Sequence, residues 1–102
     1  MVYLINPFIT CAQRYGIDIG DIGGHQMPLG IYYLGACLLK AGENVGVIDA
    51  SAFKLTDEEV IRILKKSNAK IIGITSSTAA FRNARLLAEK IRIELPEVYL
   101  VI

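Results

Sequence analysis

Small hydroxyl side chains gather in one short stretch, Thr75-Ser76-Ser77-Thr78, directly after an apolar run. Hydroxyl groups at a helix start, where backbone N–H groups are free, suit a phosphate or a ring nitrogen. Gly73 lies just before them and, because it lacks a Cβ, lets an extended ligand approach the backbone. The stretch therefore predicts a site for a phosphate-bearing ligand or, in the simpler interpretation, a helix cap formed by Ser77 or Thr78. The two roles are compatible.

A second candidate region follows the first apolar run of the chain. It opens with Asn6 and Pro7, extends to Met27 without sustained periodicity, and is rich in glycine, with Gly23 and Gly24 adjacent. Segments of about 20 residues with no secondary structure of their own are usually functional or mobile. We therefore expect this segment to contribute backbone to a binding site.

The cysteines and the acidic end of the second apolar run offer weaker signals. Cys11 and Cys37 are too few and too far apart for a zinc or iron–sulfur ligand set, so we expect them to be packing residues. Asp49 lies where a dinucleotide fold places its ribose-binding carboxylate, but no G-x-G-x-x-G follows the first apolar run. Asp49 is therefore expected to bond backbone N–H groups of its own loop.

Charge and hydrophobicity exclude several classes of protein. The 102 residues carry a formal net charge of +1, and no run of like charges indicates a surface for nucleic acid. Hydrophobic residues make up 53% of the chain, which favours a packed core over disorder. The longest apolar stretch, Leu29 to Leu39, falls short of the roughly 18 residues of a membrane span. We expect one domain with no membrane or nucleic-acid partner, in a reducing cytoplasm.

The order of elements predicts the α/β class and an open, doubly wound parallel sheet, flavodoxin-like (Rossmann-like), with strand order 2-1-3-4. Ligands of such sheets bind outside the carboxyl ends of the strands, where the strand order reverses. Here that point lies between the first and third strands, which brings Asn6-Pro7 beside the hydroxyl stretch. We expect strands at 2–5, 44–48, 70–75 and 98–102, and helices at 28–41, 56–66 and 78–95.

Three expectations concern burial. The helix at 28–41 is apolar nearly all round, so more than one of its faces should be covered, with Tyr32 and Tyr33 in the core. The strand at 70–75 has no polar face and should be covered on both sides. Helical spacing places Phe81 on the buried stripe of the last helix.

The strand at 98–102 has no helix after it to cover its second face. We therefore expect residues 1–102 to be a single, partial domain of a longer protein. An uncovered apolar edge favours pairing with other chains, so the fragment is expected to self-associate.

Five short segments carry a resemblance to a known family. Each is generic alone, but in register they resemble the cobalamin-binding domain that precedes the catalytic barrel in many radical S-adenosylmethionine enzymes. These are Leu4-Ile5-Asn6-Pro7, Pro28-Leu29-Gly30-Ile31-Tyr32-Tyr33-Leu34, Val47-Ile48-Asp49-Ala50, Ile72-Gly73-Ile74-Thr75 and Ala88-Glu89-Lys90-Ile91-Arg92.

The resemblance implies an accessory domain that holds a corrinoid for chemistry elsewhere. Its partners would be the corrinoid and the protein's own C-terminal catalytic domain, where S-adenosylmethionine and an iron–sulfur cluster would bind. The piece itself would be non-catalytic. Nine residues are assigned to cofactor binding, and none to catalysis or to a metal: Asn6, Pro7, Gly23, Gly24, Gly73, Thr75, Ser76, Ser77 and Thr78.

His25 is the single histidine of the chain and the natural candidate for a cobalt ligand. Cobalamin-dependent mutases place that histidine in an Asp-x-His-x-x-Gly motif, whereas here Asp21 lies four residues ahead and the next glycine is Gly30. We therefore expect cobalamin to bind without a histidine ligand, with His25 as a loop residue, near the corrin or away from it.

Two other functions fit the same elements. A flavodoxin-like module for another phosphate-bearing ligand, such as FMN, would use the same hydroxyls without needing the long first loop. A ligand-free assembly domain would instead use the apolar helix at 28–41 to cover a partner chain.

Overall fold

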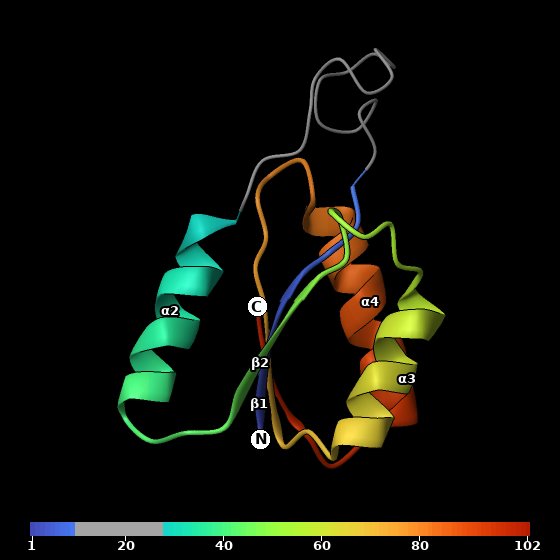
Figure 1. Cartoon of the computed structure of the whole chain (residues 1–102). Coiled ribbons are helices and arrows are strands. Elements are labelled where there is room, and N and C mark those ends of the chain that lie inside the picture. Colours follow the sequence, from blue (N-terminus) through green and yellow to red (C-terminus); the bar gives the residue numbers. More distant parts are fainter. Residues whose placement is uncertain (10–27) are drawn as a thin grey trace.

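The computed structural model describes residues 1–9 and 28–102, which form a single parallel sheet with helices on both faces (Figure 1). The strand order is β2-β1-β3-β4, as the sequence predicts, and every strand pairs in parallel with its neighbours. The fold is therefore the expected α/β, flavodoxin-like one. The strands are β1 (Val2–Asn6), β2 (Val45–Asp49), β3 (Ile71–Ile74) and β4 (Tyr99–Val101).

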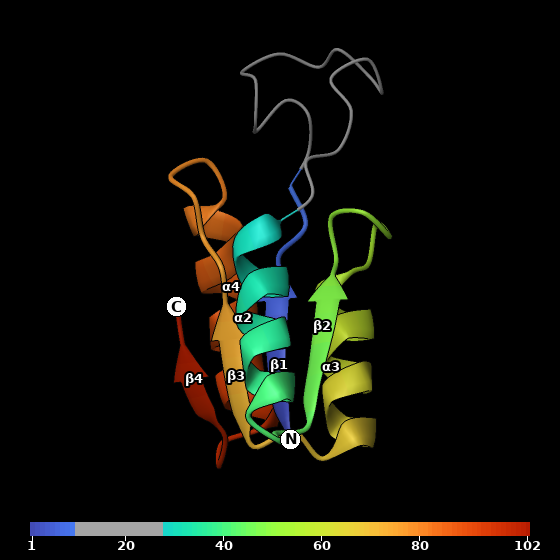
Figure 2. The same cartoon turned by 60° about the vertical axis from the view of Figure 1, so that its left-hand side comes forward.

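The helices divide unequally between the two faces. Helices α3 (Asp57–Ser67) and α4 (Phe81–Glu94) cover one face side by side, and α2 (Leu29–Lys40) lies on the other (Figures 1 and 2). The last helix begins three residues later than the expected start at Thr78, because Thr78 and the two residues after it form a turn first, closed by the Ala80 N–H on the Ser77 carbonyl.

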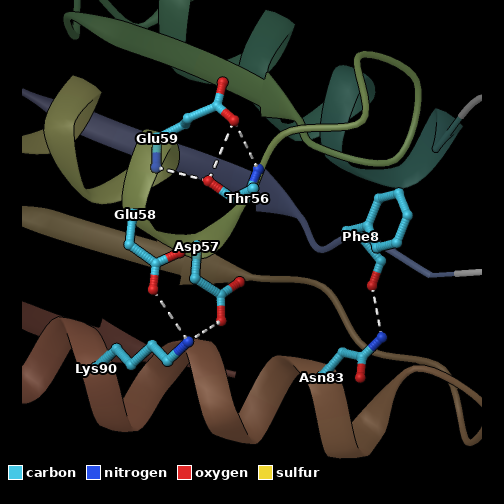
Figure 3. A network of polar contacts seen from close by, with 7 residues as sticks. All are labelled: Phe8, Thr56, Asp57, Glu58, Glu59, Asn83 and Lys90. Carbon is cyan, nitrogen blue, oxygen red and sulfur yellow. Dashed lines mark hydrogen bonds and ion pairs between the residues drawn. The ribbon is translucent and has the colours of Figure 1, made fainter.

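Helix α3 shows why these residues form these elements. Its N-cap Thr56 accepts from the Glu59 backbone N–H at 3.2 Å, and the Glu59 carboxylate accepts from the Thr56 N–H at 3.3 Å (Figure 3). This reciprocal capping box satisfies two N–H groups that the helix leaves free, as the sequence predicts. At the end of α2, Gly42 adopts a φ of 89°, which closes the helix in a conformation that favours glycine.

The main core lies between the sheet and helices α3 and α4. Its fully buried side chains include Ile5, Leu64, Ile72, Leu87 and Ile91. Two ion pairs join the exposed sides of the helices, Lys65–Glu94 at 2.6 Å and Lys90–Asp57 at 3.1 Å (Figure 3 shows the second). The two helices are thereby held together on one face of the sheet.

The opposite face is only partly covered, which makes three expectations wrong. Helix α2 buries only Ile31 and Gly35, while Tyr33 is 73% exposed and Tyr32 40% exposed. The third strand is not covered on both sides, since Ile71 is 43% exposed. Cys37 is an exposed residue of α2 and not a packing residue.

The physical reason is the position of α2. A Cβ at Gly35 would lie 3.4 Å from Val47 and 3.9 Å from Leu4, so this helix packs closely on β2 and β1. On the same face, Tyr99 and Val101 of β4 stay 76% and 60% exposed. No helix within the described ranges is long and apolar enough to cross a membrane.

Candidate functional site

The carboxyl ends of β1 and β3 lie side by side, as expected for the point where the strand order reverses. Ile5 and Ile74 are register partners, and the Thr75 N–H donates to the Ile5 carbonyl at 2.9 Å. This bond carries the pairing one residue beyond β3. It brings the Asn6-Pro7 corner next to the start of the hydroxyl stretch.

An open groove of about 640 Å³ lies at this end of the sheet. Ser76, Ser77 and Thr78 are exposed, so their hydroxyls are accessible to a ligand. Phe81, expected in the buried stripe, is 54% exposed and lines the groove instead. Phe81 is the first residue of α4, and the buried positions of the helix, Ala84, Leu87, Ala88 and Ile91, begin one turn later. The groove is lined by Ile74, Thr75, Ser76, Ser77, Thr78, Phe81 and Ile102.

Two of the hydroxyls also take part in local structure. The Ser77 Oγ accepts from the Ala80 N–H at 3.2 Å, and the Ser76 hydroxyl donates to the Ser77 carbonyl at 3.1 Å. Ser77 therefore stabilises the turn that leads into α4, although the helix itself has no side-chain cap at Ala80. Each hydroxyl keeps further capacity for hydrogen bonds, because a serine oxygen both donates and accepts.

Gly73 offers a close approach to the backbone on the partly covered face. Its neighbours Ile72 and Ile74 point into the core under α3 and α4, so the Gly73 position faces the α2 side. A Cβ there would lie 3.2 Å from the Leu4 Cδ2, and nothing else would lie within 4 Å. A slender polar ligand can therefore reach the strand at this position. Gly23 and Gly24, also assigned to binding, fall outside the described residues, as do His25 and Cys11.

The Asn6 side chain is fixed by a partner that sequence reasoning missed. Its amide donates to the Asp49 Oδ1 at 2.9 Å, and the same oxygen accepts from the Ala52 N–H at 3.1 Å. The second bond is the loop contact expected for Asp49, which is only 5% exposed. The first could not be read from the sequence, because 43 residues separate the two side chains. Asn6 therefore ties the corner after β1 to the loop after β2.

A second groove, of about 470 Å³, runs between α3 and α4. Four of its charged lining residues, Glu58, Lys65, Lys90 and Glu94, form ion pairs, because Lys65 bonds Glu94 and Lys90 bonds Asp57 and Glu58. The hydrogen bond that Lys90 donates to the Asp57 carboxylate raises the pKa of Lys90, and a backbone hydrogen bond together with the Lys90 charge lowers the pKa of Glu58. These shifts belong to an exposed ion-pair network that stabilises the helix pair. The groove at the strand ends is the better candidate site.

The site's donor set fits a corrinoid's nucleotide tail, which carries a phosphate and a flat base. The groove offers hydroxyls for the phosphate and an apolar wall at Phe81 and Ile102 for the base. Gly73, on the α2 side of β3, adds a close approach to the strand outside the groove. Within the described ranges, no group of three or more histidine, cysteine or acidic side chains could hold a metal ion. The described part of the site therefore suits an organic, phosphate-bearing cofactor.

Comparison with known proteins supports this chemistry. A family model described as the B12 binding domain matches residues 15–102. A protein of Pyrococcus horikoshii named as an uncharacterized methyltransferase is 35% identical over 68 residues, which is 67% of this chain. The chain spans 15% of the length of that relative. No solved structure matches the chain.

Proposed function

This chain belongs to the B12-binding domain family, and we propose that it binds cobalamin at the carboxyl ends of β1 and β3, with the groove that follows β3 as part of the site. The observation that carries the placement is the set of three features around the end of one strand, β3. Exposed hydroxyls and an apolar wall line the groove after β3, and Gly73 leaves the α2 side of the same strand open, next to the point where the strand order reverses. A cobalamin supplies organometallic cobalt chemistry, and the protein supplies binding and orientation.

The residues divide into two roles in this proposal. Ser76, Ser77 and Thr78 donate hydrogen bonds to polar groups of the nucleotide tail, and Gly73 lets the tail lie against β3. Asn6 and Pro7 set the direction in which the chain leaves β1, because the Asn6 amide is held by Asp49. Gly23 and Gly24 would contribute backbone, as the sequence predicts.

For the wider protein we propose a catalytic region outside these 102 residues, working in the cytoplasm. The sequence resemblance favours a radical S-adenosylmethionine barrel with an iron–sulfur cluster. The name of the Pyrococcus relative supports a methyl-transfer reaction for such a region, since that protein is named as a methyltransferase. The present chain would then hold the cofactor and leave the reaction to its partner domain.

Equilibrium titration with hydroxocobalamin and with FMN tests the proposal. Cobalamin should bind with saturation and FMN should not, and the absorption spectrum of the bound cobalamin should be unchanged in His25→Ala. Saturable FMN binding without cobalamin binding would favour the flavodoxin-like alternative. A nitrogen-coordinated spectrum that is lost in His25→Ala would overturn the assignment of cobalamin binding without a histidine ligand.

A further inference from the structure

A polar contact joins the start of α4 to the segment that leaves β1. The Asn83 side-chain amide donates to the backbone carbonyl of Phe8 at 2.7 Å, across 75 residues of sequence (Figure 3). Asn83 is half-buried in the first turn of α4, and the Phe8 ring packs against the main core. The contact is therefore built into the body of the domain rather than formed between two mobile surface groups.

Strand pairing does not fix the position of the chain at Phe8. The ladder of β1 ends at Asn6, whose carbonyl accepts from the Ala50 N–H at 2.9 Å. Pro7 follows, which has no N–H to donate. The chain beyond Asn6 is thus held on two sides by side chains, through Asp49 on the β2 side and through Asn83 on the α4 side.

We propose that Asn83 is a positioning residue for the cofactor, which it helps to bind by fixing the Phe8 carbonyl. This inference rests on the proposed cobalamin function. The Phe8 carbonyl sets where the segment after β1 leaves the sheet, and Asn83 holds it from the same first turn of α4 that places Phe81 in the groove. A segment already fixed in its bound position does not have to be ordered when the ligand binds. Asn83 contributes this order without touching the ligand.

Asn83→Asp is the sharpest variant, because it keeps the size of the side chain. A carboxylate only accepts hydrogen bonds, so it would face the Phe8 carbonyl with like partial charge. If about one molecule in ten of Asn83→Asp keeps the segment after β1 in its bound position, the apparent Kd for cobalamin rises about tenfold. Asn83→Ala removes the donor without adding charge and should raise Kd roughly fivefold. Asn44→Asp is the matched control, since Asn44 is exposed at the other end of the sheet.

Two measurements separate positioning from general stability. Kd is measured at a temperature at which each variant is fully folded, so a merely structural role would leave it unchanged. Amide hydrogen exchange of the cobalamin-free protein is measured over residues 5–9, where Asn83→Asp should accelerate exchange and Asn44→Asp should not. Unchanged Kd or unchanged exchange in Asn83→Asp would overturn the inference while leaving the proposed function intact. If the wild-type chain binds no cobalamin, the proposed function fails first, and this inference fails with it.

Discussion

Replacing Gly73 with valine should separate ligand binding from folding more clearly than any other single change. The new Cβ would lie 3.2 Å from the Leu4 Cδ2, which is closer than an ordinary contact and requires Leu4 to shift by a few tenths of an ångström. That crowding costs about 1 kcal/mol. A β-branched residue in a strand in place of glycine returns about 1 kcal/mol through strand preference and a less flexible unfolded chain. The free energy of unfolding should therefore change by less than about 1 kcal/mol.

The same side chain should strongly reduce cobalamin binding. Its methyl groups would occupy the approach to β3 that the proposal assigns to the nucleotide tail. Forcing a ligand past extra carbon atoms costs about 1 to 3 kcal/mol, which corresponds to a loss of about 5- to 150-fold in affinity. Chemical denaturation of the cobalamin-free protein and equilibrium titration with cobalamin, on the same preparations, measure the two effects separately.

Two other glycines provide matched controls for Gly73→Val. A Cβ at Gly46 would overlap the ring of Tyr3, so Gly46→Val should destabilise the fold severely. A Cβ at Gly30 would meet nothing within 4 Å among residues 1–9 and 28–102, so Gly30→Ala should change neither folding nor cobalamin affinity appreciably. The reasoning is refuted if Gly73→Val binds cobalamin as tightly as the wild-type protein does.

Three further predictions concern the hydroxyls, the exposed apolar face and the ion pairs. Ser76→Ala and Ser77→Ala should each weaken cobalamin binding by about 1 to 2 kcal/mol. Only Ser77→Ala should also lower the free energy of unfolding, by about 1 kcal/mol, because the Ser77 Oγ accepts from the Ala80 N–H. Loss of stability with unchanged affinity would leave capping as the sole role of Ser77. The 102-residue chain should self-associate through the exposed side chains of α2 and β4. Sedimentation should show less association for Tyr33→Asp, at a site that is 73% exposed, than for the control Ile93→Asp, at a site that is 77% exposed. A wild-type protein that stays monomeric at high concentration would contradict this prediction. The folded-state pKa of Glu58 lies below its ordinary value of 4.5, so the Glu58 carboxylate stabilises the fold above that pH and loses this contribution as pH falls through the folded-state pKa. The thermal unfolding temperatures of the wild-type protein and of Glu58→Gln should therefore converge in acid. A difference that stays constant with pH would contradict the assignment.

The sequence predicted the sheet well because local patterns and chain order decide it. Alternating apolar runs and amphipathic helices leave few parallel topologies, and right-handed crossovers then favour the observed order. The capping box at Thr56 and Glu59 is likewise a local signal, and the structure contains it. The meeting of the carboxyl ends of β1 and β3 followed from the same topology.

Burial on the α2 side was harder to predict, because it depends on what covers a surface rather than on what the surface is made of. An apolar helix predicts a covered helix, yet Tyr33 and Leu29 are largely exposed. Helical spacing put Phe81 in the core, but as the first residue of α4 it lines the groove instead. The contacts of Asn6 and Asn83 join residues far apart in the chain, and no local pattern marks them.

Mapping of backbone amide shifts by NMR, as cobalamin is added to the wild-type chain, tests the central claim most directly. The largest changes should fall on Gly73 and on residues 75–78, with Asn6 at the adjoining corner of β1. The groove between α3 and α4 serves as the internal comparison, and Lys65 and Lys90 should show little change. Saturable changes confined to that second groove, with residues 73–78 unaffected, would contradict a cobalamin site at the carboxyl ends of β1 and β3.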